Sequence, residues 1–326
     1  YKHFLEKKLA EKQHRLSEVA ENVMLQKSLT GRQAFIRLQD QHLTVQKTLI
    51  KIEGKQEHRT ISGLMNLLYS PDRTVREQSS KKIAVIAKRT LTQSTFTYNT
   101  LMQDFSIDAS LRSFEKSEDM RHLDNEVDRT SVTALSEVVT NAYPIVHEYY
   151  QFKEKILNIG PLYEYDRYAP ISAEKKHYSF AYAQETVLEA FNAFAPEYGD
   201  IANTFFKKRW IDTPSTNQKR NGAYCMYCTP DTNPFILLNY HGGARDVSTL
   251  AHELGHGIHA YLARGQSILQ FDWPITIAET ASIFGEMVLF KHMLQKTTDK
   301  KEKLALTMAK IEEIFASTFR QIAMYE

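Results

Sequence analysis

Apolar residues recur at helical spacing along most of the chain. From Leu16 to Val23, and again from Leu135 to Ala142, they occupy positions i, i+3, i+4 and i+7, the pattern of a helix with one buried face. The segments predicted as helices are 1–30, 70–112 with Pro71 in its first turn and a break near Thr90, 130 onwards with a kink at Pro144, 179–206, 275–295 and 303–326. The segments predicted as connections are 43–52, which fits either a short hairpin or more helix, 114–127 and 160–178.

Between Gly222 and Tyr240 the pattern changes from helical to extended. Short apolar runs at 223–227 and 235–239 flank a polar turn that contains proline. They predict two antiparallel strands, and a strand at a sheet edge could pair with the backbone of an extended peptide. A small sheet with a purely structural role fits the pattern equally well. The candidate substrate contacts in this region are Ile236, Leu238, Asn239, His241 and Gly242.

The composition limits the kinds of partner. The 326 residues include 41 basic and 39 acidic side chains, so charge gives no reason to expect a nucleic acid or an anionic membrane as partner. No apolar run approaches the length of about 18 residues that a membrane span needs. Cys225 and Cys228 have C-x-x-C spacing, but a lone pair in an extended segment is weak support for a metal or redox site. Two cysteines in a chain of this length favour a reducing compartment, so we expect a cytoplasmic protein.

The strongest chemical signal is H-E-x-x-H, formed by His252, Glu253 and His256. Residues four apart lie on one face of a helix, so both imidazoles can bind one metal ion. Glu253 lies beside that face and can take a proton from a water held by the metal, which suits hydrolysis of an amide bond. Asp246 and Gly265 bound a helix of about five turns around the motif, and Asp246 is also a candidate for orienting the site.

Two histidines leave a zinc site one protein ligand short. Leu262 stands where the metzincin pattern needs its third histidine, which excludes that class. His259 lies about 10 Å along the helix axis from the first histidine, too far to share the ion, and fits a place behind the ligands or in the core. Glu279, on the next predicted helix, is a candidate ligand, although Thr276-x-x-Glu279 also fits a capping box. Glu286, two turns further along the same face, is better placed to orient the site than to bind the metal.

Longer stretches accompany the motif. H-E-L-G-H-x-x-H begins at His252, A-E-T-A-S-x-x-x-E begins at Ala278, and the other characteristic stretches are 209–212, 221–225, 234–239, 315–321 and, more weakly, 70–73 and 165–170. Together they resemble the oligoendopeptidase F branch of the thimet-oligopeptidase-like zinc metallopeptidases. The resemblance implies one zinc ion per chain, held by His252, His256 and Glu279. It also implies that Glu253 is the general base and that short peptides are the substrates.

We therefore expect a mostly α-helical, multi-helix metallopeptidase catalytic domain with a small antiparallel β-sheet beside the active-site helix. An N-terminal helical part is expected over 1–127 and a zinc-binding catalytic part over 128–326. The oxyanion-stabilising residues of such families would follow residue 326, so we expect this chain to be a piece of a larger enzyme.

The predicted function is a zinc-dependent endopeptidase that hydrolyses internal bonds of short oligopeptides. The alternatives are a zinc exopeptidase, either an aminopeptidase or a carboxypeptidase, and a non-catalytic helical peptide-binding module with a structural metal. The sequence leaves open the side-chain preference, the native metal and the oligomeric state.

Overall fold

The computed structural model describes residues 1–52, 54–171, 177–214, 219 and 222–326. The chain divides into two compact units: a C-terminal unit of Tyr1–Phe4 with Glu174–Glu326, and an N-terminal unit of Leu5–Ala173. The predicted boundary between 127 and 128 falls within the N-terminal unit, and as a division into functional parts it stays a prediction. Asn221, in one of the characteristic stretches, and 172–176, in a predicted connection, lie outside the described residues.

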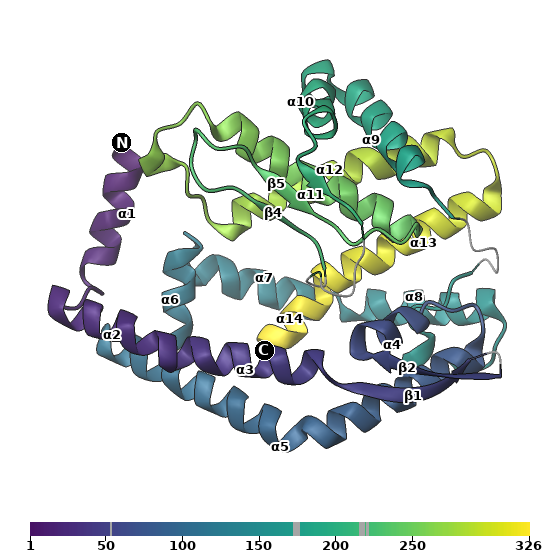
Figure 1. Ribbon diagram of the computed structural model, residues 1–326, viewed down its shortest axis with the longest axis horizontal. Helices are drawn as coiled ribbons and strands as arrows, with labels where there is room; N and C mark the ends of the chain where they lie inside the picture. The colour runs from purple at the N-terminus through teal and green to yellow at the C-terminus, as the bar shows by residue number, and fades with distance from the viewer. Residues whose placement is uncertain (53, 172–176, 215–218, 220–221) are drawn as a thin grey trace. The chain divides into compact units, whose positions relative to one another are not determined.

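The part of the chain up to residue 171 is helical except for one hairpin (Figure 1). Its elements are α1 (Lys2–Lys12), α2 (Glu18–Thr30), α3 (Arg32–Thr44), β1 (Lys47–Ile52), β2 (Lys55–Thr60), α4 (Ile61–Leu67), α5 (Arg73–Leu111), α6 (Ser117–Asp124), α7 (Arg129–Asn141), α8 (Tyr143–Leu157) and the 3₁₀ helix η1 (Glu164–Asp166). The hairpin alternative for 43–52 is correct in part: β1 lies in that segment and pairs antiparallel with β2, but β2 lies beyond it and residues 43–44 belong to α3. The helix predicted over 1–30 is divided, because Ser17 accepts a hydrogen bond from the N–H of Ala20 and caps a new helix there.

Four other predictions for this unit are wrong, each for a local reason. Helix α5 continues through Thr90, whose buried hydroxyl donates to a carbonyl one turn earlier. It begins after Pro71, because Asp72 is its N-cap. The predicted loop 114–127 contains α6, whose first turn is closed by the carboxylate of Asp119. Pro144 lies in the first turn of α8 and does not kink a continuous helix, since in a first turn the N–H that proline lacks would have no helical partner.

One carboxylate, Asp166, is fully buried between two arginines in the N-terminal unit. Arg76 Nη2 donates to its Oδ1 over 2.7 Å, and Arg73 Nη2 donates to its Oδ2 over 2.8 Å. Arg73 and Asp166 belong to the two weaker characteristic stretches, 70–73 and 165–170. The structure therefore shows that these stretches, about 90 residues apart in the chain, form one ion-pair cluster.

The C-terminal unit contains the predicted strands and the motif helix. Its elements are α9 (Phe180–Phe194), α10 (Pro196–Lys207), β3 (Ile211–Asp212), β4 (Tyr224–Met226), β5 (Phe235–Leu237), α11 (Ala244–Ala263), η2 (Ile268–Gln270), α12 (Ile275–Lys296), α13 (Lys300–Ser317) and α14 (Phe319–Tyr325). The helices predicted over 179–206 and 303–326 are each interrupted, at Ala195 before a proline and at Thr318. The predicted fold class, mostly α with a small sheet, is confirmed.

The three strands of this unit have the order β3-β5-β4. β4 and β5 are antiparallel, as predicted, with Cys225 opposite Ile236. β3 adds to the other side of β5 in parallel, and at two residues it is too short to leave an alternating pattern in the sequence. The central strand is therefore β5, and β4 is an edge strand of the described sheet.

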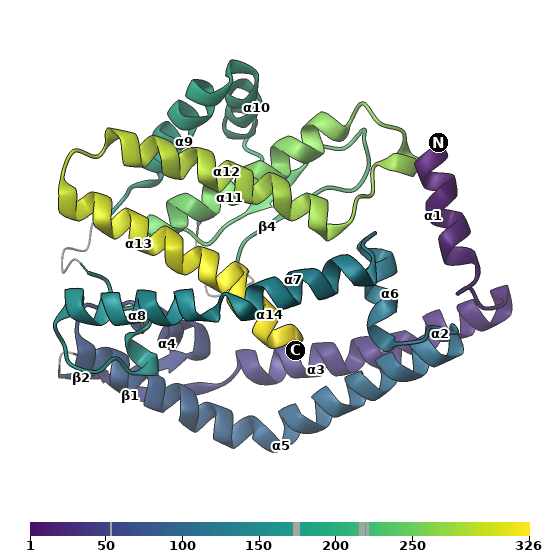
Figure 2. The same cartoon turned by 180° about the vertical axis from the view of Figure 1, so that it is seen from behind.

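Helices α9 to α12 and strand β5 enclose the core of the C-terminal unit. Its largest fully buried side chains are Phe191, Phe205, Ile236, Leu238, Leu250, Leu254 and Ile258. The last three lie on α11 at positions i, i+4 and i+8, so one face of the motif helix is held in the core. Figure 2 shows α11, α12 and α13 side by side in this unit. Within the described residues, no helix is both long enough and apolar enough to span a membrane.

Candidate metal centre

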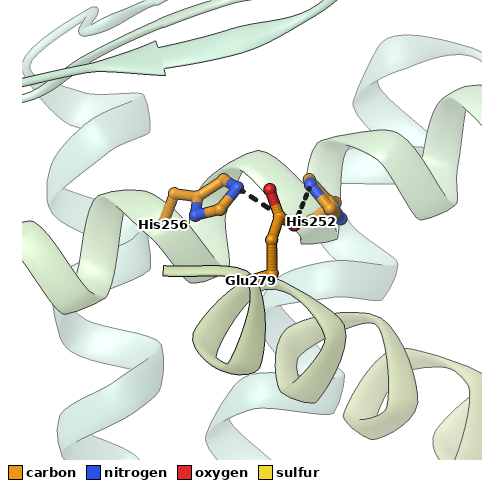
Figure 3. A group of neighbouring side chains, drawn as sticks. All are labelled: His252, His256 and Glu279. Carbon is orange, nitrogen blue, oxygen red and sulfur yellow. Dashed lines mark ion pairs between the residues drawn. The ribbon is translucent and has the colours of Figure 1, made fainter. Parts of the chain in front are cut away.

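Two helices bring three metal-ligating side chains together. His252 and His256 lie on one face of α11, with ring centroids 4.8 Å apart. Glu279 reaches them from α12: its Oε2 lies 3.5 Å from Nε2 of His252 and 3.8 Å from Nε2 of His256. Figure 3 shows the carboxylate between the two imidazoles. Two imidazole nitrogens and one carboxylate oxygen, all within 4.8 Å of one another, fit a zinc ion with one coordination position left open.

The geometry rules out the capping alternative for Glu279. Helix α12 begins at Ile275 with Pro274 as its N-cap, so Thr276 already lies in the first turn. The capping-box position of this helix is therefore residue 277, and Glu279 lies two positions too far along to occupy it. Its Oε2 instead accepts a hydrogen bond of 2.9 Å from the hydroxyl of Ser282. The side chain is thus held toward the two histidines and away from its own helix terminus.

Two glycines allow α11 and α12 to approach closely at this point. A Cβ on Gly255 would lie 2.6 Å from the backbone oxygen of Ala281, and a Cβ on Gly285 would lie 2.7 Å from that of Ala251. Neither distance leaves room for a side chain, since the obstructing atoms are backbone. Gly255 lies inside the motif, so the same five residues contain two of the three candidate ligands and the close contact that brings Glu279 near them.

Glu286 fixes the orientation of the first histidine. Its Oε1 lies 2.6 Å from Nδ1 of His252. Burial by itself would lower the pKa of His252, but this hydrogen bond raises it above its usual value. Burial would likewise raise the pKa of Glu286, yet His252 and Lys310 keep it below its usual value, so the group stays ionised. A histidine that donates through Nδ1 directs the lone pair of Nε2 toward Glu279, as metal binding requires.

Glu253 is almost completely buried, with 5% of its surface exposed. Its Oε2 has no hydrogen-bond partner among the described residues. Burial raises its pKa to about 7, and the nearby carboxylates of Glu279 and Glu286 add to the effect of burial while His252 opposes it. A carboxylate whose pKa lies near neutral can both accept and return a proton, and a buried oxygen without a partner indicates where a polar group of a water or a substrate would lie.

Two residues predicted to support the site have other contacts. The ring of His259 lies 4.3 Å from that of Trp273, and partial burial lowers the pKa of this histidine, which favours the core interpretation. Asp246 Oδ2 accepts the backbone N–H groups of Gly243 and His241, each over 2.9 Å. These are the contacts of a helix cap, which is the first of the two roles predicted for Asp246.

The candidate substrate contacts lie in the sheet and the loop before α11. The side chains of Ile236 and Leu238 are buried in the core. Asn239 Nδ2 donates to a backbone carbonyl at the start of the β4 segment. Gly242 has φ of +88°, and a Cβ there would lie 2.1 Å from the ring of His177, so only glycine fits. His241 is exposed on this loop, and a role of these residues in substrate binding stays a prediction.

A second group of potential ligands, Glu118, Asp119 and His122, lies on α6 in the N-terminal unit. Both carboxylate oxygens of Asp119 are already engaged by Arg129, and one also accepts the backbone N–H of Lys116. These contacts explain the acidic group as a helix cap with a salt bridge. Neither cysteine of the C-x-x-C pair belongs to a group of potential ligands among the described residues, and both are free thiols.

One buried residue behind the candidate ligands, Lys310, belongs to none of the sequence motifs. Lys310, on α13, is buried and donates to Oε2 of Glu286 over 2.8 Å. The sequence could have indicated its burial, because Lys310 lies four residues after Leu306 and four before Ile314, on the apolar face of a predicted helix. A lysine at such a position is rarely buried without a partner.

An H-E-x-x-H helix whose third ligand comes from a neighbouring helix defines a class of zinc metallopeptidases. The chain matches the family model described as Peptidase family M3 over residues 66–326, and the model described as Oligopeptidase F over residues 1–44. It therefore belongs to peptidase family M3, and the resemblance to the oligoendopeptidase F branch is confirmed.

Relatives and solved structures agree with this assignment. The oligoendopeptidase F homolog of Borreliella burgdorferi is 33% identical over 70% of this chain and 40% of its own length. Oligopeptidase PepF of Bacillus subtilis is 26% identical over 100% of this chain and 49% of its own length. The crystal structure of oligoendopeptidase-F from Enterococcus faecium is similar in fold, with a TM-score of 0.66 at 20% identity over 99% of this chain and 51% of that one. The chain thus spans about half the length of the relatives it matches.

Proposed function

We propose that this protein is a zinc-dependent endopeptidase that hydrolyses internal bonds of short peptides. The proposal is carried by one observation, a group of three potential ligands next to a buried carboxylate. The ligands are His252, His256 and Glu279, and the carboxylate is that of Glu253, whose Oε2 has no hydrogen-bond partner among the described residues. A site with a purely structural metal has no use for such a carboxylate, because four protein ligands close it.

The chain's own residues divide the chemistry between them. A zinc ion held by the three ligands, one per chain, would lower the pKa of a water molecule and polarise the carbonyl of the scissile bond. Glu253 accepts a proton from the attacking water, whose oxygen bonds to the carbonyl carbon. The same carboxylic acid then donates the proton to the leaving amine nitrogen as the C–N bond breaks. Glu286 keeps the imidazole of His252 aligned throughout.

The edge strand supports a peptide as substrate. The N–H groups of Ile236 and Leu238 donate to the β3 segment. The N–H and C=O groups of Leu237, which lies between them, therefore point to the other side of β5, toward β4. With Cys225 opposite Ile236, the backbone N–H and C=O of Cys225 point away from β5, toward the open edge. An extended peptide that pairs with this edge is held through its main chain, which suits substrates of varied sequence.

We also propose a cytoplasmic location. Cys225 and Cys228 are free thiols, and free thiols are typical of a reducing compartment.

The experiment that tests this function is peptide cleavage by the full-length protein and its Glu253→Gln variant, with zinc content measured in parallel. Glutamine keeps the size of the side chain but cannot accept the proton, so we expect the rate to fall about 10² to 10⁴-fold. The zinc content should be unchanged. Fragments of a ten-residue peptide should show internal cuts, whereas stepwise loss of terminal residues would indicate an exopeptidase. Full activity of the zinc-loaded variant would refute the role of Glu253.

A further inference from the structure

Lys310 is a buried cation enclosed by carboxylates. Only 7% of its surface is exposed, although lysine is among the residues that are least often buried. Its Nζ lies 2.8 Å from Oε2 of Glu286 and 2.5 Å from Oε2 of Glu313, one turn further along α13. The whole arrangement lies within the C-terminal unit, where α12 and α13 pack side by side (Figure 2).

The two oxygens of Glu286 have different partners. Oε1 accepts from Nδ1 of His252 over 2.6 Å, and Oε2 accepts from Lys310 over 2.8 Å. The Glu286 side chain is only 18% exposed, so water can take over little of either role. The carboxylate thus forms a bridge between a ligand on α11 and a cation on α13, and its rotamer is fixed from both ends.

Without Lys310, the carboxylate of Glu286 would lose the hydrogen bond to its Oε2. The largely buried carboxylate of Glu286 would then lie near the like charge of Glu313, whose side chain is 37% exposed, without a cation between them. This repulsion favours movement of Glu286 away from its present position. A displaced Glu286 no longer holds the Nδ1–H of His252. The imidazole can then rotate or adopt its other tautomer, and the Nε2 lone pair is no longer fixed toward Glu279.

We propose that Lys310 is a positioning residue for the metal site: by holding Glu286 it fixes the ring and tautomer of His252 and so sets the affinity for zinc. The inference rests on the proposed zinc site and adds to it a residue on a third helix, whose ion pairs among the described residues are with Glu286 and Glu313. A merely structural role for Lys310 would affect folding alone.

A double-mutant cycle on zinc affinity separates these roles. The zinc dissociation constant is measured by competition with a chelator for the full-length protein and for Lys310→Met, Glu286→Ala and the double variant. Outer contacts of metal-bound histidines affect affinity by about 10 to 100-fold, and we expect the lower end for Lys310→Met. If Lys310 acts through Glu286, its replacement in the Glu286→Ala background should change affinity less than about twofold.

Lys303→Met is the matched control, because Lys303 lies on the same helix and is exposed. It should bind zinc as the parent does. Thermal unfolding of the metal-free proteins shows whether each variant folds, and Lys310→Gln, which keeps hydrogen-bond donors but lacks the charge, replaces Lys310→Met if that protein does not fold.

The outcomes are distinguishable. An unchanged affinity in a folded Lys310 variant, or an equal loss in both backgrounds, would overturn the role of Lys310 while leaving the zinc site intact. Failure of the parent and of Lys303→Met to bind zinc would overturn the zinc site itself.

Discussion

Glu253 and Glu279 are carboxylates near the same two histidines, but their surroundings give them different roles. Glu253 is 5% exposed, and burial raises its pKa to about 7. The Glu279 side chain is 44% exposed and receives a hydrogen bond from Ser282. An exposed carboxylate suits a cation ligand, whereas a buried one with a raised pKa suits proton transfer. At the residue scale, therefore, the difference in burial supports the proposed roles of Glu279 as a ligand and Glu253 as the base.

This division predicts the effect of Glu279→Ala. Removing the third ligand should leave two histidines, which hold zinc too weakly to survive purification, so the zinc content should fall from about one per chain to well below half. Elemental analysis of protein prepared without chelators or a histidine tag measures it. Glu302→Ala, in the first turn of α13 and outside the groups of potential ligands among the described residues, serves as a control and should retain its zinc. A full zinc load in Glu279→Ala would show that another residue completes the site.

At the scale of elements, the site depends on how closely α11 and α12 pack. The motif could be predicted on a helix from its i, i+4 spacing and from the turn signals around it. Glu279, by contrast, could be assigned only through the family resemblance, because the spacing between two helices is not readable from either one. The close contacts at Gly255 and Gly285, the short strand β3 and the pairing of Lys310 could not be predicted for the same reason. Each is a contact between segments whose local patterns are independent.

Gly285→Ala tests this packing. The new Cβ would lie 2.7 Å from a backbone oxygen of α11, so the two helices must move apart. Overpacking of this kind costs about 1–3 kcal/mol, partly offset by a gain of up to about 1 kcal/mol in helix propensity. We expect a lower free energy of unfolding and a zinc affinity reduced at least tenfold, since Glu279 moves with α12.

Gly265→Ala provides the comparison, because a Cβ there meets no atom within 4 Å. Urea unfolding and chelator competition on the two variants give the result. If Gly285→Ala bound zinc as tightly as Gly265→Ala, the close approach of the helices would not be needed for the site.

The edge strand gives a second prediction at this scale. Cys225→Pro removes the outward N–H of β4 without removing a hydrogen bond to β5, and proline is tolerated on edge strands. Loss of one main-chain hydrogen bond to a substrate, worth about 1 kcal/mol, should raise KM about fivefold. Cys225→Ala keeps the N–H and should have the parent KM. Equal KM values for a folded proline variant and the alanine variant would exclude main-chain pairing at this position.

At the scale of the whole molecule, the two compact units use buried charge in different ways. In the C-terminal unit, Lys310 donates to Glu286, and Glu286 in turn contacts His252, one of the three proposed metal ligands. In the N-terminal unit, Arg73, Arg76 and Asp166 join the start of α5 to the segment around η1, and no metal-ligand group of the described residues includes them. We therefore expect the second cluster to have a structural role, because removal of one partner from a buried charge pair strongly destabilises a fold.

The pH dependence of stability should reveal this structural role. Burial by itself would raise the pKa of Asp166, but hydrogen bonds from Arg76 and Arg73 keep it below its usual value of 3.8. Because the folded-state pKa is the lower one, the stabilisation is complete above about pH 4 and is lost as the pH falls through the folded-state value. Asp166→Asn leaves two arginines without their carboxylate, so we expect it to lower the free energy of unfolding at neutral pH by about 3 kcal/mol.

Urea unfolding from pH 7 to pH 3 measures both effects. The parent should lose stability more steeply below pH 4 than Asp166→Asn does, because the variant lacks the group that binds the additional proton on unfolding. Asp124→Asn is the matched control: its pairing with Arg121, at 3.7 Å, is largely exposed and should contribute less than about 1 kcal/mol. Parallel curves for the parent and Asp166→Asn would mean that the arginines bind the carboxylate without stabilising the folded unit.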